Sequence, residues 1–355
     1  LGSQIIPMGS GFAVIEQPEK LWDYDAVEPG QSGSPIVVTI TKEDISWYAL
    51  VARNISFHFT PSDRCEDEEW PSQEWPPSAM PTMVLTCAPL LQEEIAEANG
   101  FVALEWSTTA RRQTPFAKCE IRWSRGVMAG DTITSTRRVL EKYTRRGSRF
   151  VTLRVEATNQ PGEEVARYDY TCIFDYAKDP KDPTREPRKA WPSSPDTPRE
   201  RFSWESVRDV GDQLSPLNIQ ASQENIDEKD SFRLAGKHNP MNIHTDEEFA
   251  RRSMFGGTVV SGGAAMSYVD QMLQKSFTLG SFHGGSLLLR AIEPFRAGDT
   301  VTFQGELTSR GDLTTAKDGD SRRVIECRIK GINQRSYLVN LSDATLILKG
   351  LAAEY

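Results

Sequence analysis

Residues 238–263 read HNPMNIHTDEEFARRSMFGGTVVSGG, and the overlapping segment 259–277 reads VVSGGAAMSYVDQMLQKSF. The second segment begins with small residues and carries apolar side chains on most faces of a helix. A helix that is apolar nearly all round must be enclosed by protein. A long antiparallel sheet curled around this helix would enclose it, so the stretch predicts an α+β fold of that kind.

The two halves of the chain resemble each other. Residues 34–54 and 215–239 both open with Ser-Pro, continue into an alternating, strand-like run and end in Asn after an acidic patch. Residues 119–134 (CEIRWSRGVMAGDTIT) and 287–303 (LLLRAIEPFRAGDTVTF) both place Ala-Gly-Asp-Thr between two strand-like runs. Gly-Asp at this position is typical of a β-hairpin turn. Two divergent copies of one α+β unit are the simplest account.

A proline-rich stretch separates the two copies. Its prolines remove backbone donors and prevent regular strand pairing, so we expect an extended linker there. The expected organisation is a first, degenerate repeat over 1–176, the linker over 177–201 and a second repeat over 202–355. The acidic, proline-rich run 62–81 is expected to be a long loop, either a wall of a binding site or a solvated excursion.

Composition limits the function classes. Lys and Arg number 41 against 50 Asp and Glu, a net charge of −9, whereas nucleic-acid-binding proteins are usually basic. No stretch reaches the roughly 18 apolar residues that cross a bilayer, and LGSQIIPMGSGF lacks a signal-peptide pattern. The five cysteines are scattered singly, which predicts neither disulfides nor a zinc site. We therefore expect a cytoplasmic protein with no nucleic-acid partner, no membrane partner and no metal.

Residues 238–263 resemble the signature of the MaoC-like, or (R)-specific enoyl-CoA hydratase, family. That signature is Gly-Asp-x-Asn-Pro-[Ile/Leu]-His, followed by Ala, Phe-Gly-Gly and a helix that starts with small residues. The resemblance implies a hot-dog fold, in which an antiparallel sheet wraps around a central helix. Two copies in one chain imply a double hot dog. The implied activity is that of a hydro-lyase acting on an enoyl-CoA or another acyl thioester.

The resemblance also implies which residues act. In the family an Asp and a His, five positions apart, share a water molecule, and a backbone N–H at the helix start polarises the thioester carbonyl. His244 matches the His and Gly262 the glycine, whereas a gap-free alignment puts Asn239 at the Asp position. Asn can orient water but cannot accept its proton; aligning the Asn-Pro pair instead would put Lys237 there. The expected catalytic residues are Asn239, His244 and Gly262, and the expected substrate-binding residues are His238, Ser261, Gly263 and Phe255.

The first copy lacks this set of residues. Its corresponding stretch keeps Asn54 and His58 but not the family spacing or the Phe-Gly-Gly element. One active site, in the second half, is therefore expected. Four aromatic residues of the first copy are expected either to line space for an acyl group or to pack in the core: Trp47, Tyr48, Phe57 and Phe59.

Three functions stay open at this point. The first is a hydratase or dehydratase in which His244 is the acid/base. The second is an isomerase or cyclase of a natural-product (secondary-metabolism) intermediate, which the missing carboxylate favours. The third is a non-catalytic partner subunit. In each case we expect a small-molecule substrate or ligand, no cofactor other than CoA carried by the substrate, and a monomer or homodimer.

Overall fold

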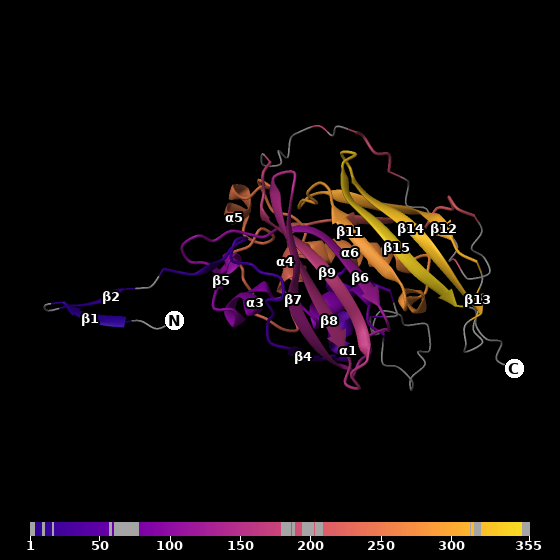
Figure 1. Cartoon of the computed structure of the whole chain (residues 1–355). Coiled ribbons are helices and arrows are strands. Elements are labelled where there is room, and N and C mark those ends of the chain that lie inside the picture. The colour runs from indigo at the N-terminus through magenta and orange to yellow at the C-terminus, as the bar shows by residue number, and fades with distance from the viewer. Residues whose placement is uncertain are drawn as a thin grey trace.

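The structure is a computed structural model that describes residues 4–8, 11–15, 18–56, 59, 78–178, 186, 189–193, 202, 209–312, 314–315 and 321–349. Phe57, His58, most of the expected linker and most of the run 62–81 lie outside these residues. At the N-terminus, β1 (Gln4–Met8) pairs with β2 (Gly11–Ile15) as an antiparallel hairpin. The rest of the described chain is organised by one large antiparallel sheet (Figure 1).

The large sheet contains the strands of both repeats. The order in the first repeat is β4 (Ile36–Thr39), β7 (Thr132–Arg145), β8 (Ser148–Thr158), β9 (Glu164–Asp175) and β6 (Phe116–Trp123). The second repeat has the same order in β10 (Leu217–Gln220), β12 (Thr300–Arg310), β14 (Ser321–Asn333), β15 (Leu338–Lys349) and β11 (Ser286–Ala291). The short strand β13 (Thr314–Thr315) pairs with β14. Because β6 pairs antiparallel with β11, the two repeats form one continuous sheet.

The turns of the two repeats are built from the same bonds. Gly130 and Gly298 both have positive φ values, +91° and +88°, which glycine adopts without steric cost. In one turn Asp131 Oδ2 accepts a hydrogen bond from the Met128 N–H at 2.8 Å. In the other Asp299 Oδ2 accepts from the Arg296 N–H at 2.9 Å. The repeat predicted from the Ala-Gly-Asp-Thr motifs is therefore confirmed, because the two turns make equivalent hydrogen bonds.

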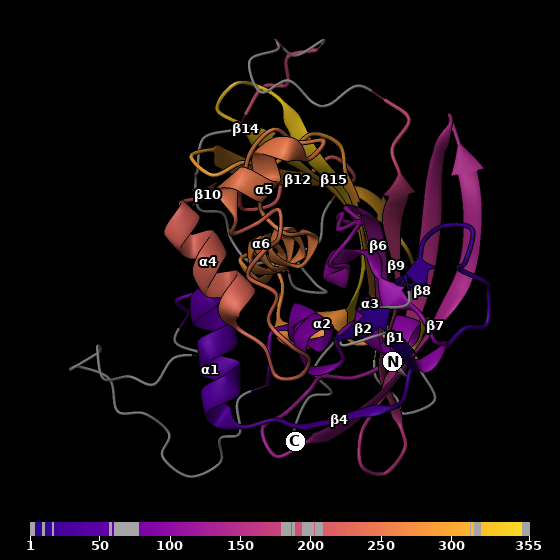
Figure 2. The same cartoon turned by 90° about the vertical axis from the view of Figure 1, so that its left-hand side faces the viewer.

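The central helix of the second repeat is α6 (Gly262–Gln274). The Ser261 hydroxyl caps it by accepting a hydrogen bond from the Ala264 N–H at 3.2 Å, as Ser at an N-cap position commonly does. Figure 2 shows α6 nearly end-on, with the sheet on one side and the helices α4 (Gln223–Ser231) and α1 (Lys42–Val51) on the other. The prediction of an enclosed helix is confirmed, since most α6 residues are buried.

The first repeat has a much shorter helix at the corresponding place. The residue three positions before each helix segment pairs with a residue of the hairpin turn: Ser78 bridges to Met128, and Val259 bridges to Arg296. In the first repeat the segment continues as η1 (Pro81–Met83) and α2 (Val84–Cys87), which have 3 and 4 residues against 13 in α6. This shortening leaves space beside α6 between the repeats.

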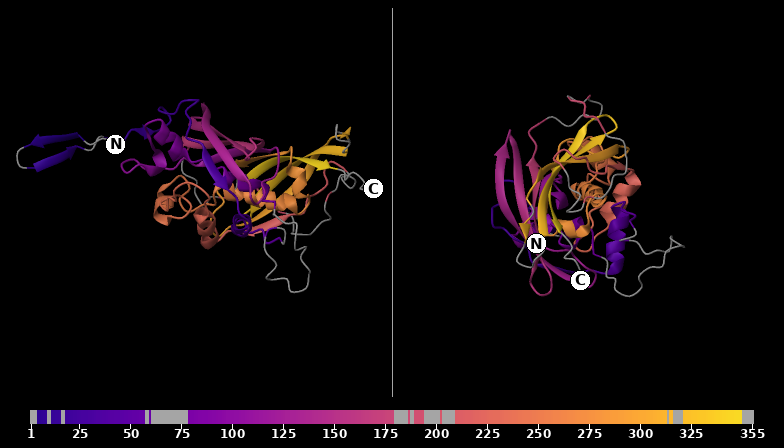
Figure 3. Two further views of the ribbon diagram at one scale, coloured as in Figure 1. Left: turned by 90° about the horizontal axis from the view of Figure 1, so that it is seen from below. Right: turned by 90° about the vertical axis from the view of Figure 1, so that its right-hand side faces the viewer.

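The remaining elements cover the ends of the sheet. They are β3 (Leu21–Trp22), which pairs parallel with β5 (Val102–Ala103), together with α3 (Gln92–Ala98), η2 (Leu104–Trp106), α5 (Glu247–Arg252) and η3 (Leu279–Phe282). Figure 3 shows the same arrangement from two further sides, with the orange helix α6 on the concave side of the yellow strands. No helix in the described part of the chain is long and apolar enough to cross a membrane.

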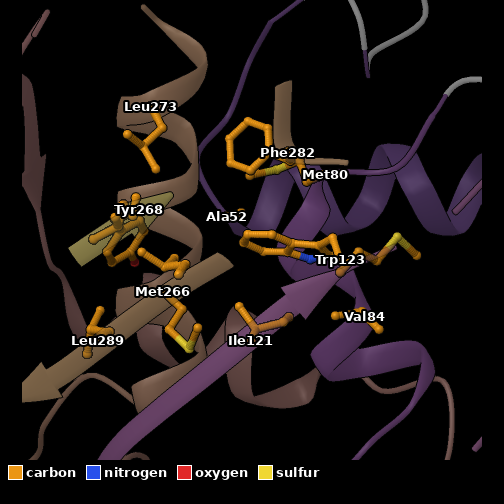
Figure 4. Packing of buried hydrophobic residues seen from close by; sticks show 14 of the residues in the cluster. Ala52, Met80, Val84, Ile121, Trp123, Met266, Tyr268, Leu273, Phe282 and Leu289 are labelled. Carbon is orange, nitrogen blue, oxygen red and sulfur yellow. The ribbon is translucent and has the colours of Figure 1, made fainter. Parts of the chain in front are cut away.

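The main core lies between α6 and the two central strands of the sheet. Figure 4 shows Met266 and Tyr268 of α6 packed beside Ile121 of β6 and Leu289 of β11. All four side chains are at most 2% exposed, and each such burial contributes roughly 1.5–3 kcal/mol. The packing alternative is confirmed for Phe59, which is buried in the same cluster. Tyr48 is buried there as well and also borders a cavity, whereas Trp47 is 58% exposed.

Candidate functional site

A cavity of about 610 Å³ lies between the two repeats beside α6. The second repeat contributes His244, Phe255 and the start of α6 to its wall. The first repeat contributes Phe116 and Tyr170, among others. A cavity of this size, with an apolar wall and a few polar groups, is typical of a small-molecule site.

His244 is held in one orientation at the cavity wall. Its Nδ1 lies 2.8 Å from the Val259 carbonyl oxygen, and because a carbonyl only accepts, Nδ1 must carry the hydrogen. The backbone of His244 is fixed on both sides, since its N–H donates to Asn242 Oδ1 at 2.7 Å and its carbonyl accepts from Gln223 Nε2 at 2.8 Å. Nε2 has no hydrogen-bond partner among the described residues, which leaves it available for proton transfer to a ligand.

The start of α6 supplies backbone donors to the same cavity. Ser261, Gly262 and Gly263 all line it, and the first N–H groups of a helix have no partner within the helix. A β-carbon on Gly262 would lie 2.4 Å from the Phe116 ring, whereas one on Gly263 would meet nothing within 4 Å. Gly262 is therefore required by the close approach of the first repeat, and Gly263 borders open space.

Asn239 lines the cavity, but its side chain is bonded to the first repeat. Its Oδ1 accepts a hydrogen bond from Arg111 Nη2 at 2.7 Å, and its Nδ2 donates to the Glu105 carbonyl at 3.0 Å. Asn239 and His244 are connected through Asn242, which donates to the Asn239 carbonyl at 2.7 Å. The structure therefore gives Asn239 a bridging position between the repeats, and the water-orienting role stays a prediction.

The expected substrate-binding residues divide into two groups. Phe255, Ser261 and Gly263 line the cavity. His238 is not among the lining residues; its Nε2 lies 3.0 Å from Asp230 Oδ2, and its side chain is 43% exposed. A direct contact of His238 with substrate is therefore not evident from the geometry.

The sequence reasoning missed the carboxylates of the cavity wall, of which Asp230 lies nearest to His244 in the hydrogen-bond network. Asp230, in the last turn of α4, is only 10% exposed at its side chain and accepts a hydrogen bond from Asn242 Nδ2 at 3.1 Å. Since Asn242 in turn accepts from the His244 N–H, Asp230 helps to fix the loop that carries His244. No family spacing points to a residue on the preceding helix, and only the acidic patch of residues 227–230 marked the region.

Other ionisable groups give the cavity a mixed electrostatic character. Burial raises the pKa of Glu93, and the nearby Glu105 carboxylate adds to that rise. Five exposed basic side chains also line the cavity: Arg145, Arg146, Lys178, Arg233 and Lys237. Among the residues described, no group of three or more His, Cys, Asp or Glu is placed to hold a metal ion.

The segment that carries the site is similar to a known protein family. Residues 214–326 match the family model of the MaoC like domain. The matched range contains His244, Asn239 and Gly262 and supports a hydratase/dehydratase type of domain. No similar protein was found among curated proteins.

Similarity to solved structures extends over nearly the whole chain. A MaoC-like dehydratase has 16% identity and a TM-score of 0.62, with 90% of this chain and 98% of that chain covered. A putative MaoC domain protein dehydratase from Chloroflexus aurantiacus has 15% identity and a TM-score of 0.58, with coverage of 95% and 99%. A conserved hypothetical protein from Mycobacterium tuberculosis, described as having a double hotdog fold, has 14% identity, a TM-score of 0.52 and coverage of 92% and 98%. The chain therefore has a double hot-dog fold and carries a MaoC-like domain in its second half.

Proposed function

We propose that the protein is a hydratase or dehydratase that adds or removes water next to the carbonyl of an acyl thioester or a related carbonyl compound. The observation that carries the proposal is the orientation of His244. Its Nδ1 donates to the Val259 carbonyl, so Nε2 is left as the proton-accepting atom at a cavity that the start of α6 also lines.

The proposed chemistry follows from these two features. His244 Nε2 takes a proton from water as the water adds to the carbon–carbon double bond, and the same proton is available for the α carbon. Charge then develops on the carbonyl oxygen, and the Gly262 N–H at the positive end of the helix dipole stabilises it. Asp230 is proposed as a positioning residue, since it contacts Asn242 and through it the His244 backbone.

The carrier of the acyl group is also a proposal. The exposed basic residues at the cavity include Arg145, Arg146 and Lys178, and such groups suit the phosphates of a CoA thioester. The protein is proposed to act on a CoA ester in the cytoplasm. The described cysteines are free thiols, which supports a reducing compartment: Cys87, Cys119, Cys172 and Cys327.

The experiment is a spectrophotometric assay with 2-enoyl-CoA and 3-hydroxyacyl-CoA esters, followed at the absorbance of the conjugated thioester. The expected result is a change with at least one ester that His244→Ala abolishes or strongly reduces. No change with any ester would remove the support for thioester hydration.

A second candidate, an isomerase or cyclase of a natural-product intermediate, keeps the same pocket. It is favoured by one observation: no hydrogen bond in the described chain joins His244 to a carboxylate, so His244 would act as the lone acid/base. Solvent-deuterium incorporation without net hydration of a β,γ-unsaturated carbonyl substrate would support this candidate over the first.

A further inference from the structure

Lys229 lines the same cavity as His244, but the proposed chemistry does not use it. It lies in the last turn of α4. Its Nζ is buried and has no hydrogen-bond partner in the described structure. An ammonium has three donors and no acceptor, and leaving all of them unpaired away from water is costly. This position therefore calls for an acceptor that the described residues do not supply.

The aromatic contact of Lys229 covers one side of Nζ only. Nζ lies 3.6 Å from the centre of the Tyr48 ring, an attractive cation–π arrangement. The Tyr48 hydroxyl points elsewhere and donates to Thr82 Oγ1 at 3.2 Å. The ring thus stabilises the charge without accepting any of its hydrogens in a conventional hydrogen bond.

The nearby buried carboxylate of Asp270 is already bonded to other groups. It accepts from the Thr82 N–H at 2.9 Å, from Thr82 Oγ1 at 2.6 Å and from Gln274 Nε2 at 2.7 Å. It makes no ion pair with Lys229, although its charge is felt there. Burial lowers the pKa of Lys229 to about 7, and the Asp270 charge offsets only part of this effect.

The surroundings of Lys229 in the cavity are apolar. Tyr48, whose ring lies beside Nζ, and Phe232 line the cavity together with Lys229, and the two rings lie 6.0 Å apart. The hydrogen bonds from Tyr48 to Thr82 and from Thr82 to Asp270 connect the ring beside Lys229 Nζ to the middle of α6, eight residues beyond Gly262. At 1.5 Å per residue this is roughly 12 Å along the helix from the proposed carbonyl site. An extended acyl chain bound at Gly262 would thus reach Lys229 with its far end.

We propose that Lys229 binds a carboxylate at the distal end of the substrate, so that the preferred substrates are thioesters of dicarboxylic acids. The identification of the near end as a thioester depends on the proposed function, whereas the carboxylate contact depends on Lys229 alone. A carboxylate supplies acceptors for the unpaired ammonium, and the apolar wall packs against the methylene chain between the two ends.

The test compares binding of two saturated thioesters of N-acetylcysteamine that differ only at the far end, the suberyl and the octanoyl ester. Calorimetry on the full chain is expected to show the suberyl ester binding about tenfold or more tightly, as a desolvated charged hydrogen bond predicts. Lys229→Met is expected to abolish this preference. Lys42→Met, which removes an exposed lysine at the start of α1, is expected to retain it.

The outcomes separate the two proposals. Equal affinities in the unaltered protein, or a preference that persists in Lys229→Met, would overturn the inference, and the first comparison needs no variant. Turnover of the matching 2-enoyl esters is measured in parallel. Turnover without a binding preference overturns only the Lys229 inference, and a Lys229-dependent preference without turnover of any ester counts against the proposed function only. Absence of binding by both esters counts against both.

Discussion

The first residue of α6, Gly262, lies directly against the ring of Phe116, so closely that a β-carbon on Gly262 would come within 2.4 Å of the ring. Phe116 begins β6 of the first repeat, and its ring also packs on Tyr170 with a centroid distance of 4.9 Å. The first repeat therefore limits which residue type fits at position 262, where the central helix of the second repeat begins. The requirement for glycine here is steric, since the β-carbon has no room.

This contact predicts opposite results for two neighbouring substitutions. Gly262→Ala is expected to destabilise the protein by on the order of 1–3 kcal/mol, because an added methyl group overpacks a filled site. It is also expected to lower kcat by displacing the helix start. Gly263→Ala is expected to keep or raise stability, since its methyl group meets nothing within 4 Å and alanine favours helix. Urea unfolding of both variants is the measurement.

A double variant checks the cause. If the ring of Phe116 is the obstacle, Phe116→Leu should recover part of the stability that Gly262→Ala loses. Equal stability of Gly262→Ala and the unaltered protein would show that the helix start can move freely. That result would weaken the assignment of the Gly262 N–H as a fixed donor.

His244→Ala is expected to reduce kcat by on the order of 10²–10⁴, the usual contribution of a general acid/base. The fold should be retained, because the side chain contributes a single hydrogen bond, to the Val259 carbonyl. His238→Ala provides the comparison: since His238 contacts Asp230 and does not line the cavity, its kcat should change far less. Steady-state kinetics with far-UV circular dichroism checks both, and a silent His244→Ala would refute the site.

The sequence predicted the parts of this molecule that local patterns encode. The Ala-Gly-Asp-Thr turns and the enclosed helix rest on residues within a few positions of one another, and so does the choice of His244, which lies at the cavity wall. The partners of the site residues do not. Arg111 contacts Asn239 and Phe116 contacts Gly262 across more than a hundred residues of chain, and no spacing rule relates such pairs. Lys229 on an acidic, strongly polar helix gave no sign of burial.

The contacts of Asn239 lead to a prediction for Asn239→Asp, the change that restores the family residue. The new carboxylate would pair with Arg111 and would face the Glu105 carbonyl without the hydrogen that Nδ2 now donates. Loss of that bond is expected to cost about 1 kcal/mol, and a carboxylate held by Arg111 is a weaker base. We therefore expect no increase in kcat at any pH. An increase would show that the position supports the family's Asp/His chemistry directly.

The buried ammonium of Lys229 predicts how stability depends on pH. Its pKa is lowered from 10.5 in the unfolded chain to about 7 in the fold. Below pH 7 both states are protonated and the fold bears the full cost of burying the charge. Between pH 7 and pH 10.5 the unfolded chain binds more protons than the folded chain, so the stability of the unaltered protein rises with pH.

The variant Lys229→Met lacks this pH dependence. It should therefore be more stable near pH 7, by on the order of 2–4 kcal/mol, and the advantage should shrink toward pH 10. Urea unfolding between pH 7 and pH 10 measures this gain. The control Lys42→Met is expected to differ from the unaltered protein by the same free energy of unfolding at every pH. The stability gain of Lys229→Met could instead be absent, constant or growing with pH. Any of these results would mean that Lys229 contacts water or an acceptor in the fold. The cavity would then have no unpaired ammonium to bind a carboxylate.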